Sequence, residues 1–178
     1  MAVQRLSRTL GVLMLAALVS GCAADPSVEP TPTPTFANED EAFAAAEATY
    51  RAYVDALNQV DLADPATFEE VYAWTTGSFN ADERESLSRM HADGWVVSGD
   101  SSINSVQRLS VADGSVKIGS CLDVSAIALE DATGASRVTS DRPQVQQTII
   151  EMVPAVDSIT GLRILEVAGG TLETPCNG

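Results

Sequence analysis

Residues 102–129, SINSVQRLSVADGSVKIGSCLDVSAIAL, change the hydrophobic period of the chain from that of a helix to that of a strand. Apolar and polar residues alternate along much of this stretch, and valine and isoleucine are frequent, as in β-strands. Ala112-Asp113-Gly114 predicts a tight turn between a strand at residues 102–110 and a second at 115–129. The second strand would need a bend or a bulge, for which we expect Gly119 to be the site.

Two more strand patterns follow, at residues 143–153 and 162–168, after a turn predicted at residues 131–134. Upstream of the strands, apolar residues recur at helical spacing. Residues 39–60 form the longest such pattern, which begins after Asn38, a candidate N-cap, and starts with three acids that favour a helix N-terminus. We expect one long amphipathic helix there, with a buried face of aromatic residues and alanines.

Two shorter helices are expected between the long helix and the strands. The second helix is predicted at residues 64–77, where Asp-Pro supplies an N-cap and a proline at the first helical position. The third begins with residues 80–83, Asn-Ala-Asp-Glu, which look like a capping box, and has Gly94 as its C-cap. Helices followed by strands predict an α+β fold, with three N-terminal helices packed on a curved antiparallel sheet.

The N-terminus has the features of a secretory signal peptide. Arg5 and Arg8 precede an apolar run at residues 10–19, which is too short to span a bilayer. Residues 19–22, Val-Ser-Gly-Cys, follow this run and resemble the lipobox of bacterial lipoproteins, whose cysteine takes a diacylglyceryl group. We expect Cys22 to anchor the mature chain to the membrane through this lipid. The alternative is an ordinary signal peptide with an incidental cysteine.

A proline- and threonine-rich spacer follows the anchor and cannot pack a core. We expect three segments: a lipoprotein signal peptide at residues 1–21, the lipidated Cys22 with its spacer at 22–37, and one domain at 38–178. In polyproline II conformation, at about 3.1 Å per residue, the spacer would hold the domain about 40 Å from the lipid. The expected location is the extracytoplasmic face of the cell membrane.

The composition is strongly acidic. Loss of the signal peptide removes two of ten basic residues and no acid, so the mature chain has 8 basic and 25 acidic residues and a net charge of −17. Like charges repel, which argues against nucleic acid and against electrostatic binding to anionic lipid. We interpret the charge as a solubilising surface rather than a ligand-steering face. A single lysine, Lys117, and abundant alanine are typical of high-GC genomes and predict an actinobacterial source.

The three cysteines divide into one lipidated residue and one pair. In an exported and oxidising setting, we expect Cys121 and Cys176 to form a disulfide that closes a loop of about 55 residues and pins the C-terminal tail. No His or Cys cluster lies nearby in the sequence, so we expect no metal site, and nothing predicts a cofactor.

Several short motifs resemble those of one group of proteins. They are Cys121-Leu-Asp123-Val-Ser125, Asp131-Ala-Thr-Gly134, Arg142, Gly161-Leu-Arg163-Ile and Pro175-Cys176. Together with the order of helices and strands, they look like actinobacterial lipoproteins with a domain of the NTF2-like superfamily, of the SnoaL and ketosteroid-isomerase type. The resemblance implies a cone in which three helices pack against a strongly curved sheet. This fold hosts enzymes, binding modules and oligomerisation domains, so it implies no single function.

Enzymes of this superfamily use a buried Asp, or an Asp with a His, as general base in the open end of the cone. The corresponding candidates for a pocket here are Asp123, Glu151 and His91. For Asp123 we favour the alternative of a structural ion pair with an arginine on a neighbouring strand. Three arginines are candidates for that partner: Arg108, Arg142 and Arg163. For His91 we favour a partly exposed position near a helix C-terminus.

Motifs for a phosphate loop, a serine nucleophile or a metal site are missing from the sequence. Trp74, Trp95 and Tyr72 could line a pocket, but we interpret them as core residues. We therefore expect a membrane-anchored, non-enzymatic binding or accessory module for a small apolar ligand or a protein partner. The alternative is a lyase or isomerase with an Asp general base in the cone pocket. A homodimer is a further candidate, because many members of this fold pair through the outer sheet face.

Overall fold

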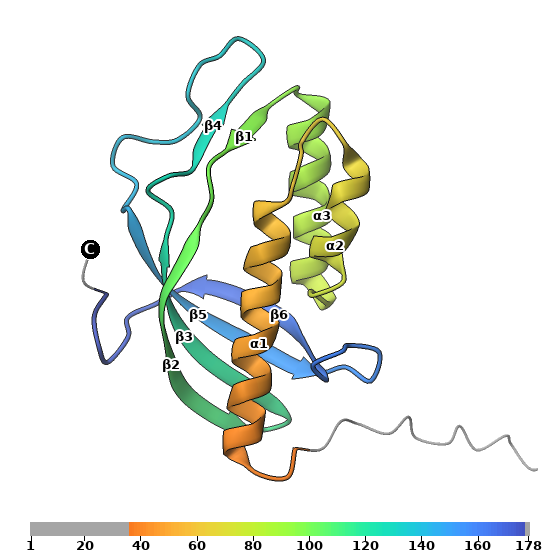
Figure 1. Ribbon diagram of the computed structural model, residues 1–178, viewed down its shortest axis with the longest axis vertical. Helices are drawn as coiled ribbons and strands as arrows, with labels where there is room; N and C mark the ends of the chain where they lie inside the picture. Colours follow the sequence, from red (N-terminus) through yellow and green to blue (C-terminus); the bar gives the residue numbers. More distant parts are fainter. Residues whose placement is uncertain (1–35, 177–178) are drawn as a thin grey trace, which may run out of the picture. The chain divides into compact units, whose positions relative to one another are not determined.

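The computed structural model describes residues 36–176. Three helices lie on one face of a four-stranded antiparallel sheet, and a two-stranded ribbon adjoins one end of that sheet (Figure 1). This arrangement confirms the predicted α+β fold of helices packed on an antiparallel sheet. The predicted signal peptide, Cys22 and nearly all of the spacer lie outside the described residues. None of the helices among residues 36–176 has the length and hydrophobicity of a membrane-spanning segment.

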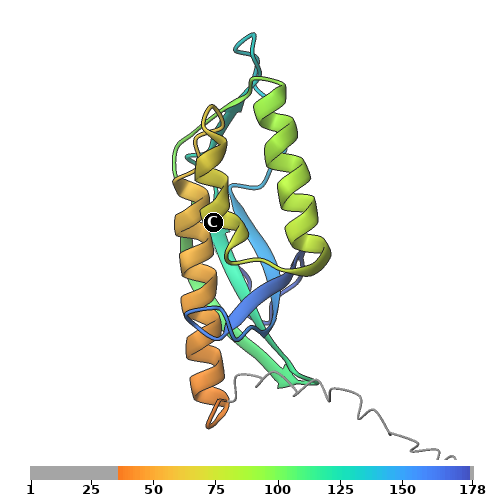
Figure 2. The ribbon, with the colours of Figure 1, turned by 90° about the vertical axis from the view of Figure 1, so that its right-hand side faces the viewer.

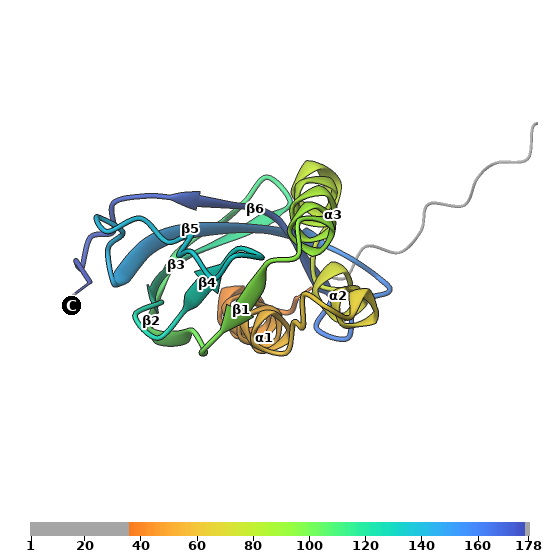
Figure 3. The same cartoon turned by 90° about the horizontal axis from the view of Figure 1, so that it is seen from above.

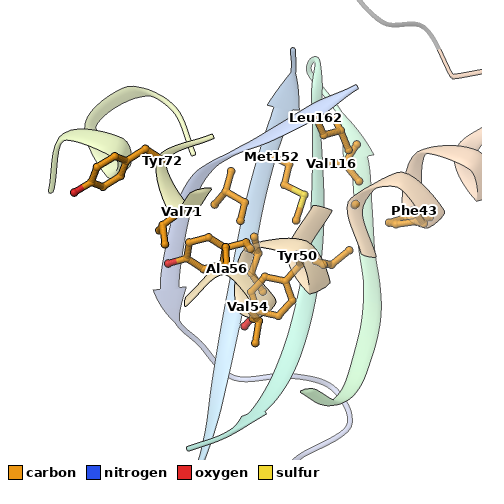
Figure 4. Close-up of a cluster of buried hydrophobic side chains, with 14 of the residues drawn as sticks. Phe43, Tyr50, Val54, Ala56, Val71, Tyr72, Val116, Met152 and Leu162 are labelled. Atoms are coloured by element: carbon orange, nitrogen blue, oxygen red, sulfur yellow. The ribbon is translucent and has the colours of Figure 1, made fainter. Parts of the chain in front are cut away.

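The long helix α1 (Glu39–Asn58) packs its apolar face against the sheet. Asn38 caps it as predicted, because its side-chain oxygen accepts a hydrogen bond from the backbone N–H of Glu41 at 2.9 Å. Tyr50 and Val54 are buried between α1 and the strands (Figure 4). Seen from above, the sheet curves around α1 (Figure 3).

Two short pieces, η1 (Pro65–Thr67) and α2 (Phe68–Tyr72), stand where the sequence predicts one helix at residues 64–77. The predicted start is correct, but the helix ends earlier than expected. It ends because the chain next pairs with the edge of the sheet, where the backbone N–H of Thr76 donates to the carbonyl oxygen of Ile164 at 2.8 Å. Backbone donors used in this way are not available to continue a helix.

Helix α3 (Gly77–Ala92) lies beside α1 and α2 (Figure 2) and begins three residues before the predicted capping box at residues 80–83. That prediction is wrong, because strand pairing leaves Thr76 in an extended conformation at the N-cap position. Asn80 lies inside the helix and donates from its side-chain amide to the carbonyl oxygen of Tyr72 at 3.1 Å. The predicted end is correct: Gly94 follows the helix with a φ of 67°, which glycine adopts without strain.

The four-stranded sheet is antiparallel throughout, in the order β2-β3-β5-β6. Its strands are β2 (Ser102–Ala112), β3 (Ser115–Asp123), β5 (Val145–Pro154) and β6 (Leu162–Gly169). The ribbon pairs β1 (Val96–Ser98) with β4 (Ala128–Glu130), and β1 was not predicted. The turn between β2 and β3 has positive φ at both Asp113 and Gly114, so it is of the primed type that suits a tight hairpin.

The strand predicted at residues 115–129 is divided in two. β3 ends at Asp123, whose carboxylate accepts a hydrogen bond from the backbone N–H of Ser125 at 2.8 Å and so favours a turn there. No β-bulge occurs at Gly119, because its pairing with both neighbouring strands is regular. Because glycine has no side chain, Leu172 can pack directly against the backbone of Gly119; a Cβ at this position would lie 2.4 Å from Cδ2 of Leu172.

The C-terminal tail covers part of the outer face of β3. Leu172 lies against Gly119 and is only 3% exposed. The predicted disulfide is confirmed: Cys121 is bonded to Cys176, with their Cα atoms 5.5 Å apart. The tail is also joined to β2, because the side chain of Gln107 donates to the carbonyl oxygen of Thr174 at 2.6 Å.

Candidate functional site

An apolar pocket of about 290 Å³ lies where the C-terminal ends of α1 and α3 approach the β1–β4 ribbon and the end of β3. Eleven of its fourteen lining residues are apolar, so the pocket suits an apolar group rather than a polar one. The side chains come from all layers of the fold and include Leu57, Leu87, Met90, Leu122, Leu129 and Val138. We call this space the ribbon pocket.

Asn58 and Ser101 form one polar part of the ribbon pocket, and they bond to each other. The Asn58 amide donates to the carbonyl oxygen of Ser101 at 2.9 Å, and its oxygen accepts from the Ser101 N–H at 3.0 Å and hydroxyl at 2.9 Å. These bonds fasten the end of α1 to the segment that leads into β2. Because the Asn58 side chain is already engaged, we assign the pair to holding the wall of the pocket.

Arg142 is the third polar residue of the lining and its only charged one. Its Nη2 donates to the carbonyl oxygens of Val124 at 2.8 Å and Ile127 at 3.0 Å, in the segment where the chain leaves β3. Arginine has five N–H donors, so the other three have no acceptor among the described residues. The predicted pair between Arg142 and Asp123 does not form.

Asp123 is the last residue of β3 and does not line the ribbon pocket. Hydrogen bonds from the side chain and backbone of Ser125 lower the pKa of this carboxyl below its usual value. A carboxylate that holds its charge so firmly is a poor proton acceptor at neutral pH. The other two predicted partners are engaged elsewhere, since Arg108 pairs with Asp40 and Arg163 pairs with Asp157 at 3.0 Å.

Glu151 lies on β5 and pairs across the sheet with Lys117, with 2.9 Å between Oε2 and Nζ. Hydrogen bonding to Lys117 is the main reason that the pKa of Glu151 is lowered. Glu151 is also absent from the lining of the ribbon pocket. The geometry therefore makes Glu151 one half of a cross-strand ion pair.

His91 is exposed in the last turn of α3, in agreement with the predicted position near a helix C-terminus. Its Nδ1 lies 2.7 Å from the carbonyl oxygen of Leu62, and its ring meets Phe68 edge-on with centroids 6.4 Å apart. Leu62 lines the ribbon pocket but His91 does not. The structure thus brings none of the three predicted pocket residues into this cavity.

A carboxylate with a raised pKa occurs at a position that the sequence analysis considers only as part of a capping box. Burial raises the pKa of Glu83 on α3, and the Tyr53 hydroxyl on α1 donates to its Oε1 at 3.2 Å. Burial also raises the pKa of Tyr53. Each residue lies one helical turn before a pocket residue, Leu87 and Leu57 respectively, but neither is part of the lining.

The predicted core role of the aromatic residues is confirmed for Tyr72, which is buried, while Trp74 and Trp95 are half-buried and pack against the core. The guanidinium of Arg137 covers the Trp95 ring, 4.8 Å from its centroid. Residues 36–176 contain no group of three or more acidic, histidine or cysteine residues that could hold a metal ion.

No family model matches the chain, and no curated protein matches it. Solved structures match the chain at low sequence identity. CagV, a VirB8 homolog of the T4SS from Helicobacter pylori, is 11% identical over 73% of this chain and 99% of its own, with a TM-score of 0.46. The intermembrane space region of the chloroplast protein ARC6 is 18% identical over 76% and 98%, with a TM-score of 0.47. Aln2 from a Streptomyces species is 14% identical over 76% and 91%, with a TM-score of 0.43. Because every one of these TM-scores is below 0.5, the likenesses assign neither a family nor a function to the chain.

Proposed function

We propose that this chain is a lipid-anchored extracytoplasmic binding module of the NTF2-like type, which holds a small apolar ligand in the ribbon pocket. The observation that carries the proposal is the lining of that pocket, which is apolar at eleven of fourteen positions and contains no carboxylate and no histidine. Such a lining favours transfer of an apolar group out of water. It offers no general base, which is why we place binding before catalysis.

The anchor belongs to the same proposal and rests on the sequence. Cys22 follows a basic segment and a short apolar run, and two acyl chains on one cysteine suffice for stable membrane attachment. Replacing Cys22 with Ser should move the protein from the membrane fraction to the soluble fraction of its host. Retention of the variant on the membrane would contradict the anchor and would leave the binding proposal standing.

Pairing of two copies through the outer sheet face is compatible with this function. The C-terminal tail covers that face at Gly119 and Cys121, so a second copy would have to contact the part that the tail leaves open.

Binding is tested with N-phenyl-1-naphthylamine, an uncharged apolar fluorophore whose emission rises on leaving water. We expect the unmodified chain to bind it at one site. Val138→Trp, which adds an indole to the pocket wall, should abolish binding. Val156→Trp is the matched control, because Val156 is 53% exposed between β5 and β6 and does not line the pocket.

Equal binding by the Val138→Trp and Val156→Trp variants would show that the fluorophore occupies another place. Failure of the unmodified chain to bind the fluorophore would contradict the proposed function. Circular dichroism of both variants checks that the fold is kept.

A further inference from the structure

We propose that the ligand of the ribbon pocket is an amphipathic anion, whose apolar body lies among the leucines and whose charged head meets Arg142. This inference rests on the proposed function, because it specifies the ligand of the same pocket.

The sequence contains ten lysine and arginine residues, and all of them except Arg5 and Arg8 lie in the described part of the chain, which leaves eight. Seven of these have a carboxylate oxygen within 4.0 Å. Arg142 is the one basic residue between positions 36 and 176 without such a partner. Acids are not scarce, since they outnumber basic residues by 17 after removal of the signal peptide. The unpaired cation is therefore an exception, and it stands at the ribbon pocket.

The structural role of Arg142 uses only part of the side chain. Its two hydrogen bonds, to the carbonyl oxygens of Val124 and Ile127, both start from Nη2. The Nη1 and Nε donors and the positive charge have no counterpart among the described residues. A carboxylate or phosphate oxygen is the group that such donors bind most strongly.

The rest of the lining determines what must be attached to the anion. Eleven apolar residues surround the remaining space, and no acid among them would repel a negative head group. The volume of about 290 Å³ is at the small end of ligand pockets, which favours a single short chain or ring over a lipid with two chains. A short-chain carboxylate or phosphate monoester combines these properties.

The test compares ligands with the same tail on the unmodified full chain. Isothermal titration calorimetry with octanoate, octyl phosphate, 1-octanol and octylamine varies only the head group. We expect the two anions to bind about tenfold more tightly than the alcohol, which is the gain typical of one charge-assisted hydrogen bond. The amine should bind most weakly, although the net charge of the protein would by itself attract it. The order of octanoate and octyl phosphate shows which head group fits better.

Variants then assign the effect to one residue. Arg142→Gln should reduce the affinity for octanoate about tenfold and leave the affinity for 1-octanol unchanged. Arg142→Lys should restore part of the preference, because it keeps the charge. Arg137→Gln is the matched control from the same loop, since Arg137 already pairs with Asp131 and does not line the pocket.

The outcomes separate this inference from the proposed function. Equal affinity for octanoate and 1-octanol, or tighter binding of octylamine, overturns the anion and leaves an apolar site. Failure of the unmodified chain to bind the uncharged fluorophore overturns the proposed function itself, whereas binding of the fluorophore but of none of the four ligands overturns only this inference. An Arg142→Gln variant that weakens acid and alcohol equally shows that Arg142 only supports the wall, and this also overturns the inference. The comparison of head groups on the unmodified chain is valid even if an Arg142 variant does not fold.

Discussion

Removal of the disulfide between Cys121 and Cys176 should lower the free energy of unfolding by an amount that follows from the length of the loop. The bond joins positions 55 residues apart. In the chain-entropy account, closing a loop of this length removes unfolded-state entropy worth about 4 kcal/mol at 25 °C. We expect the Cys121→Ala/Cys176→Ala variant to lose about this much stability while it keeps its fold.

The fold should survive because the tail has contacts of its own. Leu172 is buried against Gly119, and Gln107 exchanges two hydrogen bonds with Thr174, one to its carbonyl oxygen and one from its N–H. Truncating a buried leucine to alanine costs about 2–5 kcal/mol. If the tail stays docked without the bond, Leu172→Ala should cost the same in the presence and absence of the disulfide, within about 0.5 kcal/mol.

Urea unfolding followed by circular dichroism measures both effects, with Cys22→Ser in every variant so that only the pair of interest remains. Non-reducing mass spectrometry establishes that the bond is present in the reference protein. An unchanged unfolding midpoint in the double-alanine variant would refute the loop-closure reasoning. A much smaller cost of Leu172→Ala in that variant would show that the covalent bond alone holds the tail.

Three further predictions concern single residues. Burial raises the pKa of Glu83, so the Glu83 carboxyl binds its proton more tightly in the folded chain than in the unfolded chain. The contribution of this protonated carboxyl to stability is fully present below the unfolded-state pKa and is lost as the pH rises through the folded-state pKa. Glu83→Gln keeps an acceptor for Tyr53 and removes the charge, so urea midpoints across this pH range should fall less steeply and should be higher at neutral pH than in the parent. Gly119→Ala should destabilise the chain by about 1–3 kcal/mol in urea unfolding, as overpacking does, whereas Gly169→Ala, with nothing within 4 Å of the added Cβ, should not. Ser120→Ala should be neutral or stabilising by about 1 kcal/mol in thermal unfolding, because the fully buried hydroxyl has no partner among the described residues; a clear loss would reveal a partner such as a bound water.

Most of the fold could be predicted because its signals are local. The N-cap of α1, the tight turn at Asp113 and the glycine after α3 each depend on residues within a few positions of one another. The boundaries that failed depend on distant partners. α3 begins at Gly77 because Thr76 pairs with Ile164, almost ninety positions away, and no local pattern carries that information.

The same distinction explains why the ribbon pocket could not be predicted. Its apolar residues look like ordinary core positions of helices and strands, and only the three-dimensional arrangement of the ends of α1, α3 and β3 brings them around one space. β1 has three residues and gives too short a signal to be recognised as the strand that places Val97 in the pocket lining. Arg142 is one of three arginines predicted to pair with Asp123, whereas its side chain donates to the carbonyl oxygens of Val124 and Ile127 and lines the pocket.

The acid-base requirements of catalysis are the reason that we propose binding before catalysis. A general base needs a carboxylate that is within reach of the ligand and has a pKa near the working pH. Asp123 and Glu151 fail on both counts, since neither lines the pocket and hydrogen bonds lower the pKa of each. Glu83 has the raised pKa, but it accepts a hydrogen bond from Tyr53 one helical turn before the lining residue Leu87. Glu83→Gln should therefore change the pH dependence of stability and leave octanoate affinity as it was, whereas a base acting on the ligand would require both to change.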